Sequence, residues 1–412
     1  MINQLKVFFS RYVGMKKWCS ILFIMFVGLF FVDGITRYKH LVLYCAIITS
    51  VFIIYYERQI VKELVKSHVF KFLVLLLIAG IYSSSISIDN SMSFKYFFNT
   101  IAEKTVLTPI AFALVLSQLT HRQICQSLLI GLGLMFIISG GKEFYAYYVE
   151  YCQGIYPFSN YNHRFIAEAL IFSLPCLLLL WKTKGIKAKI IFVVAACLYG
   201  FLMLGLLQRG AWLAILVFSL LWCVFNREWK LPLLVTLIVA VCGMGLFVKF
   251  HERLSVLTYK LEQTSSSHRF GNGTQGAAWD MIMQHPVKGT GIGDKVYLKA
   301  YANNLPQYQQ WFFREPIGPH NFFLSNWFAG GVLGLFVAVS VVLVLLITAF
   351  KGYRCSENLI RYCYSSVFLM VFADFFVRGW VEETFIFQTA IASAFLMGMF
   401  LSPRRIIQTS AK

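Results

Sequence analysis

The side chains best suited to chemistry in this sequence are one histidine and a set of arginines at the ends of apolar segments. His320 follows Pro316, Gly318 and Pro319 and directly precedes a long apolar run. A histidine near its ordinary pKa can accept a proton from a hydroxyl group at neutral pH. The competing interpretation is a histidine at a helix start whose ring is satisfied by backbone groups or lipid headgroups.

Two arginines lie where an anion could bind. Arg209 opens Arg-Gly-Ala-Trp after an apolar run, and Arg269 precedes a helix that we predict over 275–285. Arginine beside a glycine-rich helix start combines a charged fork with free backbone N–H donors, and this combination suits phosphate. Each arginine could instead be passive, because Arg209 could snorkel to lipid headgroups and Arg269 could be a solvated surface side chain.

Three further charged residues, Arg164, Arg378 and Glu382, also lie at the ends of apolar segments. Charges near membrane depth are costly and are therefore candidates for function, although each alone could be an interfacial anchor. Together, the four arginines and His320 predict an anion site with a base beside it. The sequence has no Asp-x-Asp pair and no His/Asp/Glu cluster at metal-ligand spacing, so we predict no metal site.

A glycine-rich string, Gly289-Thr-Gly-Ile-Gly293, is not assigned to this site. It follows His285-Pro286 rather than a strand of a βαβ unit, so it does not match a dinucleotide-binding fingerprint. We predict instead a turn that closes the helix over 275–285.

The elements that must position these residues are membrane helices. Of the 412 residues, 58% are hydrophobic and 13% are charged, whereas about 25% of a water-soluble domain is charged. The apolar segments are continuous and approach the length of about 20 residues that a helix needs to cross a bilayer. Backbone in lipid must satisfy its own hydrogen bonds, which leaves helices or closed barrels. Continuous rather than alternating runs predict an all-α polytopic membrane protein.

We predict about twelve transmembrane helices. Their expected ranges are 18–33, 40–56, 69–85, 105–118, 123–140, 165–181, 189–207, 210–225, 231–249, 321–349, 361–378 and 385–402. The tenth contains Gly330, Gly331 and Gly334 and is long, so we expect it to begin as an interfacial helix and to bend before it crosses. The stretch 91–104 has the pattern of an amphipathic entry to the fourth span.

A polar segment over 250–319 separates the first nine spans (1–249) from the last three spans and the C-terminal tail (320–412). It is too rich in aromatic residues for a disordered linker, so we predict a large, partly helical loop that caps an active site. Lys and Arg are more frequent in the connections on the N-terminal side of the membrane, which places both termini in the cytoplasm and the loop outside. A reaction outside the cytoplasm needs a substrate that arrives already activated.

Composition also excludes several classes of protein. The net charge of +19 is not arranged as a basic block interleaved with aromatic residues on a soluble domain, so we expect no nucleic-acid partner. The ten cysteines fall mostly inside predicted spans, and the loop has none, so neither a disulfide framework nor a CxxC metal site is indicated. The basic N-terminus precedes an apolar run without a good cleavage site, so we expect an uncleaved first helix.

Five motifs together resemble one family. They are Asp33-Gly-Ile-Thr-Arg-Tyr-Lys-His, Arg209-Gly-Ala-Trp, Asn272-Gly-Thr-Gln-Gly-Ala-Ala-Trp, His320-Asn-x-x-Leu324-x6-Gly331-x-x-Gly334 and Arg378-Gly-x-x-Glu382. Over nearly the whole chain, these motifs and the span layout resemble the O-antigen ligases of lipopolysaccharide assembly, most closely the enterobacterial type. The string that begins at His320 is the most specific, although O-antigen polymerases and protein O-glycosyltransferases share a looser form.

The resemblance implies a glycosyltransferase that uses no ATP, metal or other cofactor. Its donor would be O-antigen linked to undecaprenyl diphosphate, its acceptor a sugar hydroxyl of lipid A–core, and its location the periplasmic face of the bacterial inner membrane. The family's essential histidine corresponds to His320 and its span-end arginine to Arg209. Its loop arginine falls at Gln275, four residues before Trp279, so Arg269 is the alternative candidate.

We therefore expect a single displacement that inverts the anomeric carbon. His320, Arg209 and Arg269 would be catalytic, and five further residues would bind the diphosphate or the sugars: Arg164, Arg378, Glu382, Asn321 and Gln275. Two other functions stay open at this point. One is an O-antigen polymerase, which uses the same donor but a lipid-linked acceptor, and the other is a flippase for lipid-linked oligosaccharides, which makes no bond.

Overall fold

The computed structural model describes residues 14–228, 230, 256, 257, 259 and 268–402, and nearly all of the regular structure in these residues is helical, with no strand. The all-α prediction is therefore confirmed for the described part of the chain. The first half contains α2 (Met15–Leu29), α3 (Thr36–Tyr56), α4 (Gln59–Lys66), α5 (His68–Ser85), α6 (Asn90–Tyr96), the π-helix η1 (Phe97–Leu107), α7 (Thr108–Leu116) and α8 (His121–Cys152).

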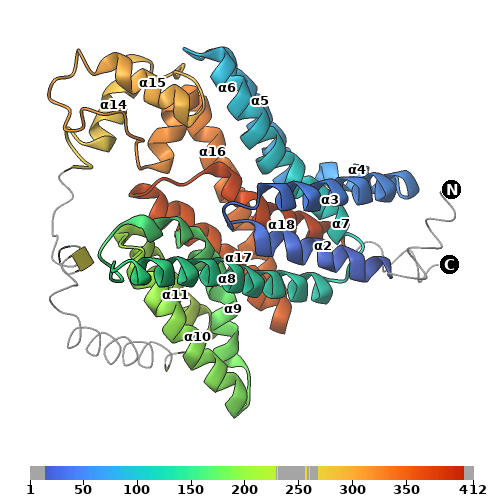
Figure 1. Cartoon of the computed structure of the whole chain (residues 1–412). Helices are drawn as coiled ribbons and strands as arrows, with labels where there is room; N and C mark the ends of the chain where they lie inside the picture. Colours follow the sequence, from blue (N-terminus) through green and yellow to red (C-terminus); the bar gives the residue numbers. More distant parts are fainter. Residues whose placement is uncertain (1–13, 229, 231–255, 258, 260–267, 403–412) are drawn as a thin grey trace.

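The second half of the chain also consists of helices joined by loops (Figure 1). It contains the 3-10 turn η2 (Asn162–Ile166), α9 (Ala167–Lys182), α10 (Ile186–Gly205), α11 (Arg209–Asn226), α14 (Thr274–Gln284), α15 (Asp294–Asn304), α16 (Phe322–Cys355), α17 (Asn358–Val371), η4 (Phe372–Val377), η5 (Arg378–Trp380), η6 (Ile386–Thr389) and α18 (Ala390–Leu401).

Nine helices among the described residues are long and apolar enough to cross a membrane. They correspond to nine of the twelve predicted spans. The first and last predicted spans are shorter than expected, since α2 has 15 residues and the final apolar helix covers only Ile386–Leu401. The ninth predicted span, 231–249, lies outside the described residues. The predicted count of twelve is thus not confirmed.

The last helix is short because it lies inside the bundle. α18 packs along α7 and also contacts α16 and α8, and almost all of its side chains are buried. Its small residues, including Ala392, Ser393 and Gly398, permit this close approach. The stretch 91–104 leads directly into the fourth span, because α6, η1 and α7 form one continuous helical segment over Asn90–Leu116.

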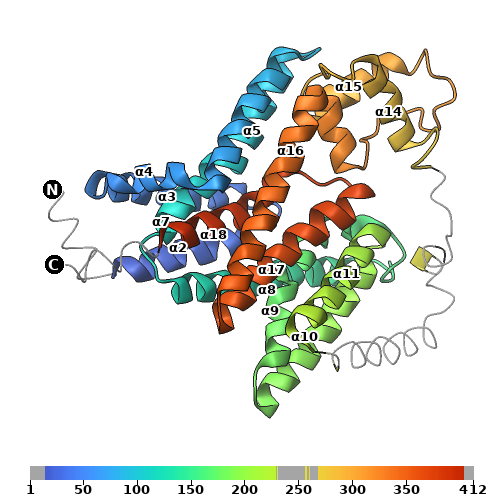
Figure 2. The same ribbon diagram turned by 180° about the vertical axis from the view of Figure 1, so that it is seen from behind.

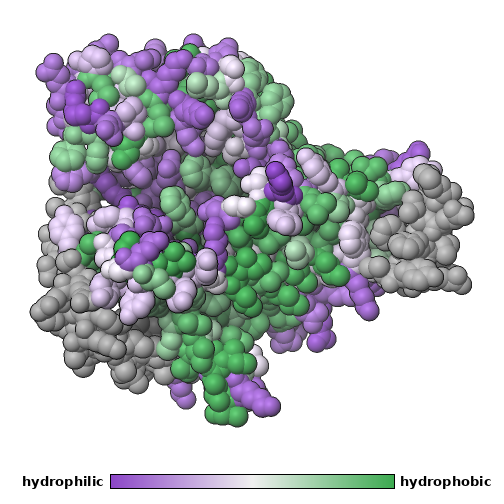
Figure 3. Space-filling view, in the orientation of Figure 1, coloured by the Kyte–Doolittle hydropathy of each residue, from purple (hydrophilic) through white to green (hydrophobic). Residues whose placement is uncertain are grey.

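The described part of the aromatic-rich segment before α16, residues 268–321, is folded, and it lies beside the beginning of α16 in both views (Figures 1 and 2). The helix predicted over 275–285 is confirmed as α14. Together, α14 and α15 enclose a small core of their own that includes Met281, Tyr297, Tyr301, Trp311 and Phe328. Hydrophilic residues gather over this part of the surface, whereas hydrophobic residues cover much of the helical body (Figure 3).

The predicted bend in the tenth span is confirmed as a break in α16. Gly330 and Gly331 have non-helical backbone angles, with φ +60° and ψ −150° at Gly331. The glycine string at 289–293 supplies hydrogen bonds to the helix carbonyls at the break. The N–H groups of Thr290 and Gly291 donate to the carbonyls of Phe328 (2.8 Å) and Ala329 (3.0 Å). The predicted turn after α14 is confirmed too, since the Gly289 N–H donates to the carbonyl of His285 (2.9 Å).

Replacing Gly331 by alanine is expected to destabilise the protein by at least about 1–3 kcal/mol, since only glycine adopts this backbone conformation readily. A Cβ at Gly331 would also lie 2.0 Å from the carbonyl oxygen of Val287. The measurement is the thermal unfolding midpoint of the purified protein in detergent. Gly141→Ala is the control, because a Cβ at that helical position meets nothing within 4 Å. Equal midpoints for the two variants would contradict the prediction.

Candidate functional site

One cavity of about 260 Å3 gathers most of the predicted site residues. Five of them line it: Arg164, Arg209, Arg269, His320 and Glu382. Gln208, His268, Thr274, Phe313 and Ile317 complete most of the wall. The five charged or titratable residues come from five separate segments, so the fold, and not local sequence, creates the cluster. We call this space the arginine cavity.

Helix starts surround the arginine cavity. Arg164 lies in η2 before α9, Arg209 is the first residue of α11, and His320 precedes the N-cap of α16. Thr274 is the first residue of α14, and Arg269 lies in the turn before this helix, where its carbonyl accepts from the Gln275 N–H (2.8 Å). The start of a helix carries a partial positive charge from its unpaired N–H groups. Helix dipoles and three arginines therefore both make this cavity attractive to an anion.

Hydrogen bonds from neighbouring side chains fix the backbone at His320. It has a φ of +48°, and its carbonyl accepts a hydrogen bond from the Gln275 side-chain amide (3.4 Å), which also donates to the carbonyl of Trp380 (2.9 Å). Asn321 caps α16, because its side-chain oxygen accepts from the N–H groups of Phe323 and Leu324. The Asn321 amide donates to the same Trp380 carbonyl (3.0 Å). These contacts fix the position of the backbone from which the His320 imidazole projects.

The imidazole of His320 is in a state suited to accept a proton. Burial lowers the pKa of His320; Glu382 raises it, while Arg269 and Arg164 lower it further, and the net direction is downward. The ring is therefore neutral at pH 7. Its Nδ1 atom is buried and has no hydrogen-bond partner in the described part of the chain.

Two arginines of the cavity, Arg164 and Arg269, keep donors available. Nη2 of Arg269 donates to Oε1 of Glu382 at 2.7 Å, but the buried Nη1 of the same guanidinium has no partner among the described residues. The guanidinium of Arg164 lies 4.1 Å above the ring of Tyr161, and its buried Nε also has no partner there. Buried donors without partners are costly, so a bound anion would stabilise this arrangement.

Arg378 does not line the arginine cavity. Its guanidinium is buried and donates to carboxylates of Asp374 (2.8 Å) and Glu168, and to the carbonyl of Glu383 (3.1 Å). Two carboxylates already neutralise this cation, so it supports the fold of the 378–383 segment. Gln275 and Asn321 are also absent from the cavity wall and act on the backbone around His320.

The carboxylates that hold Arg378 and the backbone beside Arg164 could not be recognised from the sequence. Glu168 and Asp374 lie inside apolar segments and could only be recognised from their pairing with Arg378. Likewise, the ring of His163 binds Glu143 with one nitrogen and Glu150 with the other (3.0 Å), which fixes the backbone next to Arg164. Within the described ranges, no group of three or more His, Cys, Asp or Glu residues could hold a metal ion.

Two comparisons with known proteins bear on this site. A family model described as O-antigen ligase matches residues 191–339, which include Arg209, Arg269 and His320. The chain is also 35% identical over 389 residues to an O-antigen ligase of Salmonella typhimurium. That alignment covers 93% of this chain and 95% of the Salmonella protein.

Proposed function

Because this chain belongs to the O-antigen ligase family, we propose that it transfers O-antigen polysaccharide from undecaprenyl diphosphate to a sugar hydroxyl of lipid A–core. Family membership supports a glycosyltransferase-type enzyme that joins O-antigen to lipid A–core. The choice of donor, the chemical mechanism and the inverted product are our proposals. The nine apolar helices of the described residues support a polytopic membrane protein.

The observation that carries the proposal is the arginine cavity, in which Arg164, Arg209 and Arg269 surround His320. A lipid diphosphate carries negative charge that increases as its bond to the sugar breaks. Guanidinium groups bind phosphate oxygens through paired, charge-assisted hydrogen bonds. The cavity therefore has the charge and the donors to stabilise the leaving group, and such electrostatic stabilisation is often the largest contribution to catalysis.

The proposed reaction is a single displacement. The acceptor hydroxyl gives its proton to His320, and its oxygen forms a bond to the anomeric carbon of the donor sugar. The bond between that carbon and the diphosphate oxygen breaks at the same time, and undecaprenyl diphosphate leaves with the bonding electrons. Attack from the side opposite the leaving group inverts the anomeric configuration. Glu382 holds Arg269 in place by an ion pair until the diphosphate arrives.

We propose that the reaction takes place at the periplasmic face of the inner membrane, with both termini in the cytoplasm. The distribution of Lys and Arg among the predicted connections supports this orientation. The folded segment with α14 and α15 contributes Arg269 and Thr274 to the cavity, so it would act as a cap that excludes water from the reacting sugars. Membrane lipid would surround the donor's polyprenyl tail.

The pH dependence should report the state of His320. Since the folded protein lowers the pKa of His320, the neutral base persists to a lower pH than for a free histidine, whose pKa is about 6.5. With acceptor saturating, kcat/KM for the donor is expected to stay level from pH 8 to about 6.5 and to fall only below that value. A decrease that begins above pH 7 would contradict the assignment of His320 as the base.

The direct test uses the purified protein in detergent with undecaprenyl diphosphate-linked O-antigen and lipid A–core. We expect lipid A–core that carries O-antigen, without added ATP. A flippase would form no product in this assay. A polymerase would lengthen the lipid-linked donor and leave lipid A–core unmodified, and either result would overturn the proposed function.

A further inference from the structure

A second cavity, of about 170 Å3, lies against the other side of the backbone that carries His320. Gly318 and Pro319 line it, whereas His320 lines the arginine cavity. In the same way, Glu383 lines the second cavity and Glu382 the first. Two stretches of backbone thus form a common wall, and consecutive residues face different spaces. We call the second space the carboxylate cavity.

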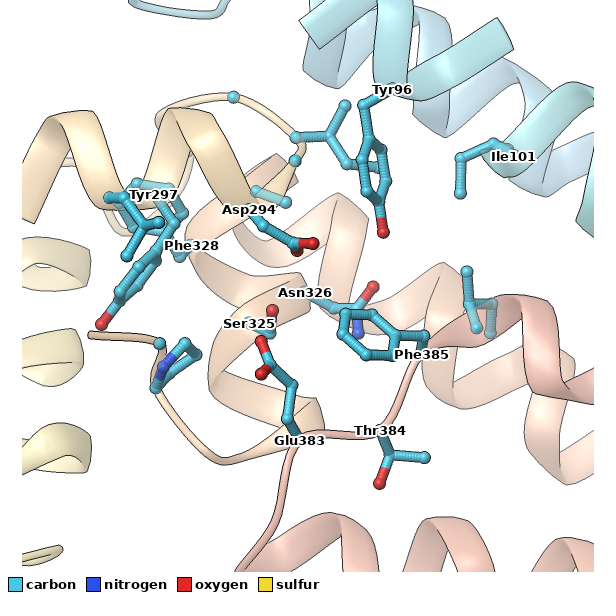
Figure 4. Close-up of a pocket in the computed structure, with 18 residues that line it drawn as sticks. Tyr96, Ile101, Asp294, Tyr297, Ser325, Asn326, Phe328, Glu383, Thr384 and Phe385 are labelled. Atoms are coloured by element: carbon cyan, nitrogen blue, oxygen red, sulfur yellow. The ribbon is translucent and has the colours of Figure 1, made fainter. Parts of the chain in front are cut away.

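The carboxylate cavity is built from segments far apart in the chain. Tyr96 comes from α6, Asp294 from α15, Asn326 from α16 and Glu383 from the segment before η6 (Figure 4). The Glu383 carboxylate covers the backbone of Gly318, since a Cβ there would lie 3.1 Å from its Oε1. This contact places the carboxylate two residues from His320 along the chain.

The polar groups of this cavity include several without partners. The carboxylates of Asp294 and Glu383 make no ion pair or side-chain hydrogen bond within the described residues. The hydroxyl of Tyr297 is buried without a partner there, although its residue is only 4% exposed. A buried polar group is normally hydrogen-bonded, so the Tyr297 hydroxyl points to a ligand. The carboxylates of Glu383, which is half-buried, and Asp294, which is exposed, are open to the same ligand.

The charge of the cavity restricts the class of ligand. No Lys or Arg belongs to its lining, in contrast to the arginine cavity. A phosphate would be repelled by Asp294 and Glu383. Burial and the nearby charge of Asp294 raise the pKa of Glu383 to about 7, and burial raises the pKa of Asp294. Carboxylates that resist ionisation in this way suit an uncharged ligand that donates hydrogen bonds.

Aromatic side chains complete the lining. Tyr96 and Phe385 lie on one side of the cavity, and the Tyr96 hydroxyl points toward its interior (Figure 4). Ser325, Asn326 and Thr384 add hydroxyl and amide groups. Sugars present hydroxyl groups at their edges and apolar C–H faces, so carboxylate acceptors beside aromatic rings match both parts of a neutral sugar.

We propose that the carboxylate cavity binds uncharged sugar residues of the acceptor, next to the hydroxyl that His320 deprotonates. This inference rests on the proposed function. Asp294 and Glu383 would accept hydrogen bonds from sugar hydroxyls that do not react, while the sugar that bears the reacting hydroxyl extends past the common wall to His320 in the arginine cavity. The charge of each cavity then selects its substrate: the arginine cavity binds the donor diphosphate, and the carboxylate cavity binds the acceptor sugar.

The test compares the Michaelis constants for the two substrates in the detergent assay. Glu383→Gln and Asp294→Asn are each expected to raise KM for lipid A–core about 10-fold, because each replaces a carboxyl oxygen that accepts from a sugar hydroxyl by an amide NH2 group that cannot accept. KM for the lipid-linked donor should stay within about twofold. Glu315→Gln is the matched control, since Glu315 is exposed and lines neither cavity. Tyr96→Phe removes one hydroxyl group and should raise KM for the acceptor by less than either carboxylate substitution.

The outcomes separate the inference from the proposed function. If the wild-type protein forms no product, the proposed function fails. If the wild type is active and the substitutions leave KM for the acceptor unchanged, or raise KM for the donor instead, only the carboxylate cavity is wrongly assigned. A third outcome is that chelation of divalent cations abolishes acceptor binding by the wild-type protein. This would show that the carboxylate cavity binds a cation and not a sugar, and would also overturn the inference.

Discussion

Replacing His320 by alanine is expected to lower the rate of O-antigen transfer by about 10²–10⁴-fold, the contribution typical of a positioned general base. The imidazole lines the arginine cavity, its pKa is lowered so that it is neutral at pH 7, and its Nδ1 has no partner among the described residues. Without this imidazole, the acceptor hydroxyl loses the group that we propose takes its proton. The rate should be measured with purified protein in detergent, and O-antigen-capped lipopolysaccharide on gels gives the cellular counterpart.

His285→Ala is the matched control for His320→Ala. His285 lies in the same folded segment, at the end of α14, but it is exposed and lines neither cavity. We expect its transfer rate to equal that of the wild type at equal expression. Full-length O-antigen ladders at wild-type level in cells that contain only His320→Ala would show that the base has been wrongly assigned.

Arg209→Ala and Arg269→Ala are each expected to lower the transfer rate by about 10²–10³-fold, as for the loss of one well-placed electrostatic donor. Both side chains line the arginine cavity, and Nη1 of Arg269 has no partner within the described ranges. Lysine at either position should restore only part of the rate, because an ammonium group cannot form the paired hydrogen bonds of a guanidinium. Initial rates at saturating acceptor are the measurement.

Two further substitutions sharpen the arginine prediction. Arg314→Ala is the control, since Arg314 is exposed and donates to backbone carbonyls of its own loop, such as those of Tyr308 and Gln309. Gln275→Ala separates the two candidates for the family's loop position. A silent Arg269→Ala together with an inactive Gln275→Ala would make Gln275, which holds the backbone of His320, the family's functional loop position in place of Arg269.

The cluster around His320 could be predicted from sequence because membrane helices limit where polar residues can lie. Arg164, Arg209 and Glu382 each adjoin an apolar segment, and the positive-inside rule puts these ends on one face. The break in α16 was predictable for a similar reason, since two adjacent glycines in a long apolar helix weaken it. Such expectations depend only on local composition and on the thickness of a bilayer.

The role of Arg378 could not be predicted, because its partner Glu168 is 210 residues earlier in the chain. Its position at the end of an apolar segment predicts a cation that is available to substrate, whereas in the fold Arg378 is paired with the carboxylates of Glu168 and Asp374. The carboxylate cavity was missed for the same reason, since Asp294 and Glu383 come together only through packing of α15 beside the segment after η5. Nine of the twelve predicted spans are long, apolar helices in the described residues, and apolar length alone does not distinguish a helix that crosses lipid from one buried in protein, such as α18.

The carbonyl of Trp380 accepts hydrogen bonds from both Gln275 of α14 and Asn321 at the start of α16. One oxygen atom thus links the cap to the two segments that hold His320 and Glu382. If the cap moves away, the Gln275 amide loses its hydrogen bonds to the carbonyls of His320 and Trp380. The cap then no longer fixes the backbone at His320. In the proposed mechanism, an uncapped donor would then face a misaligned base, which would protect the activated polysaccharide from being lost to water before its acceptor is in place.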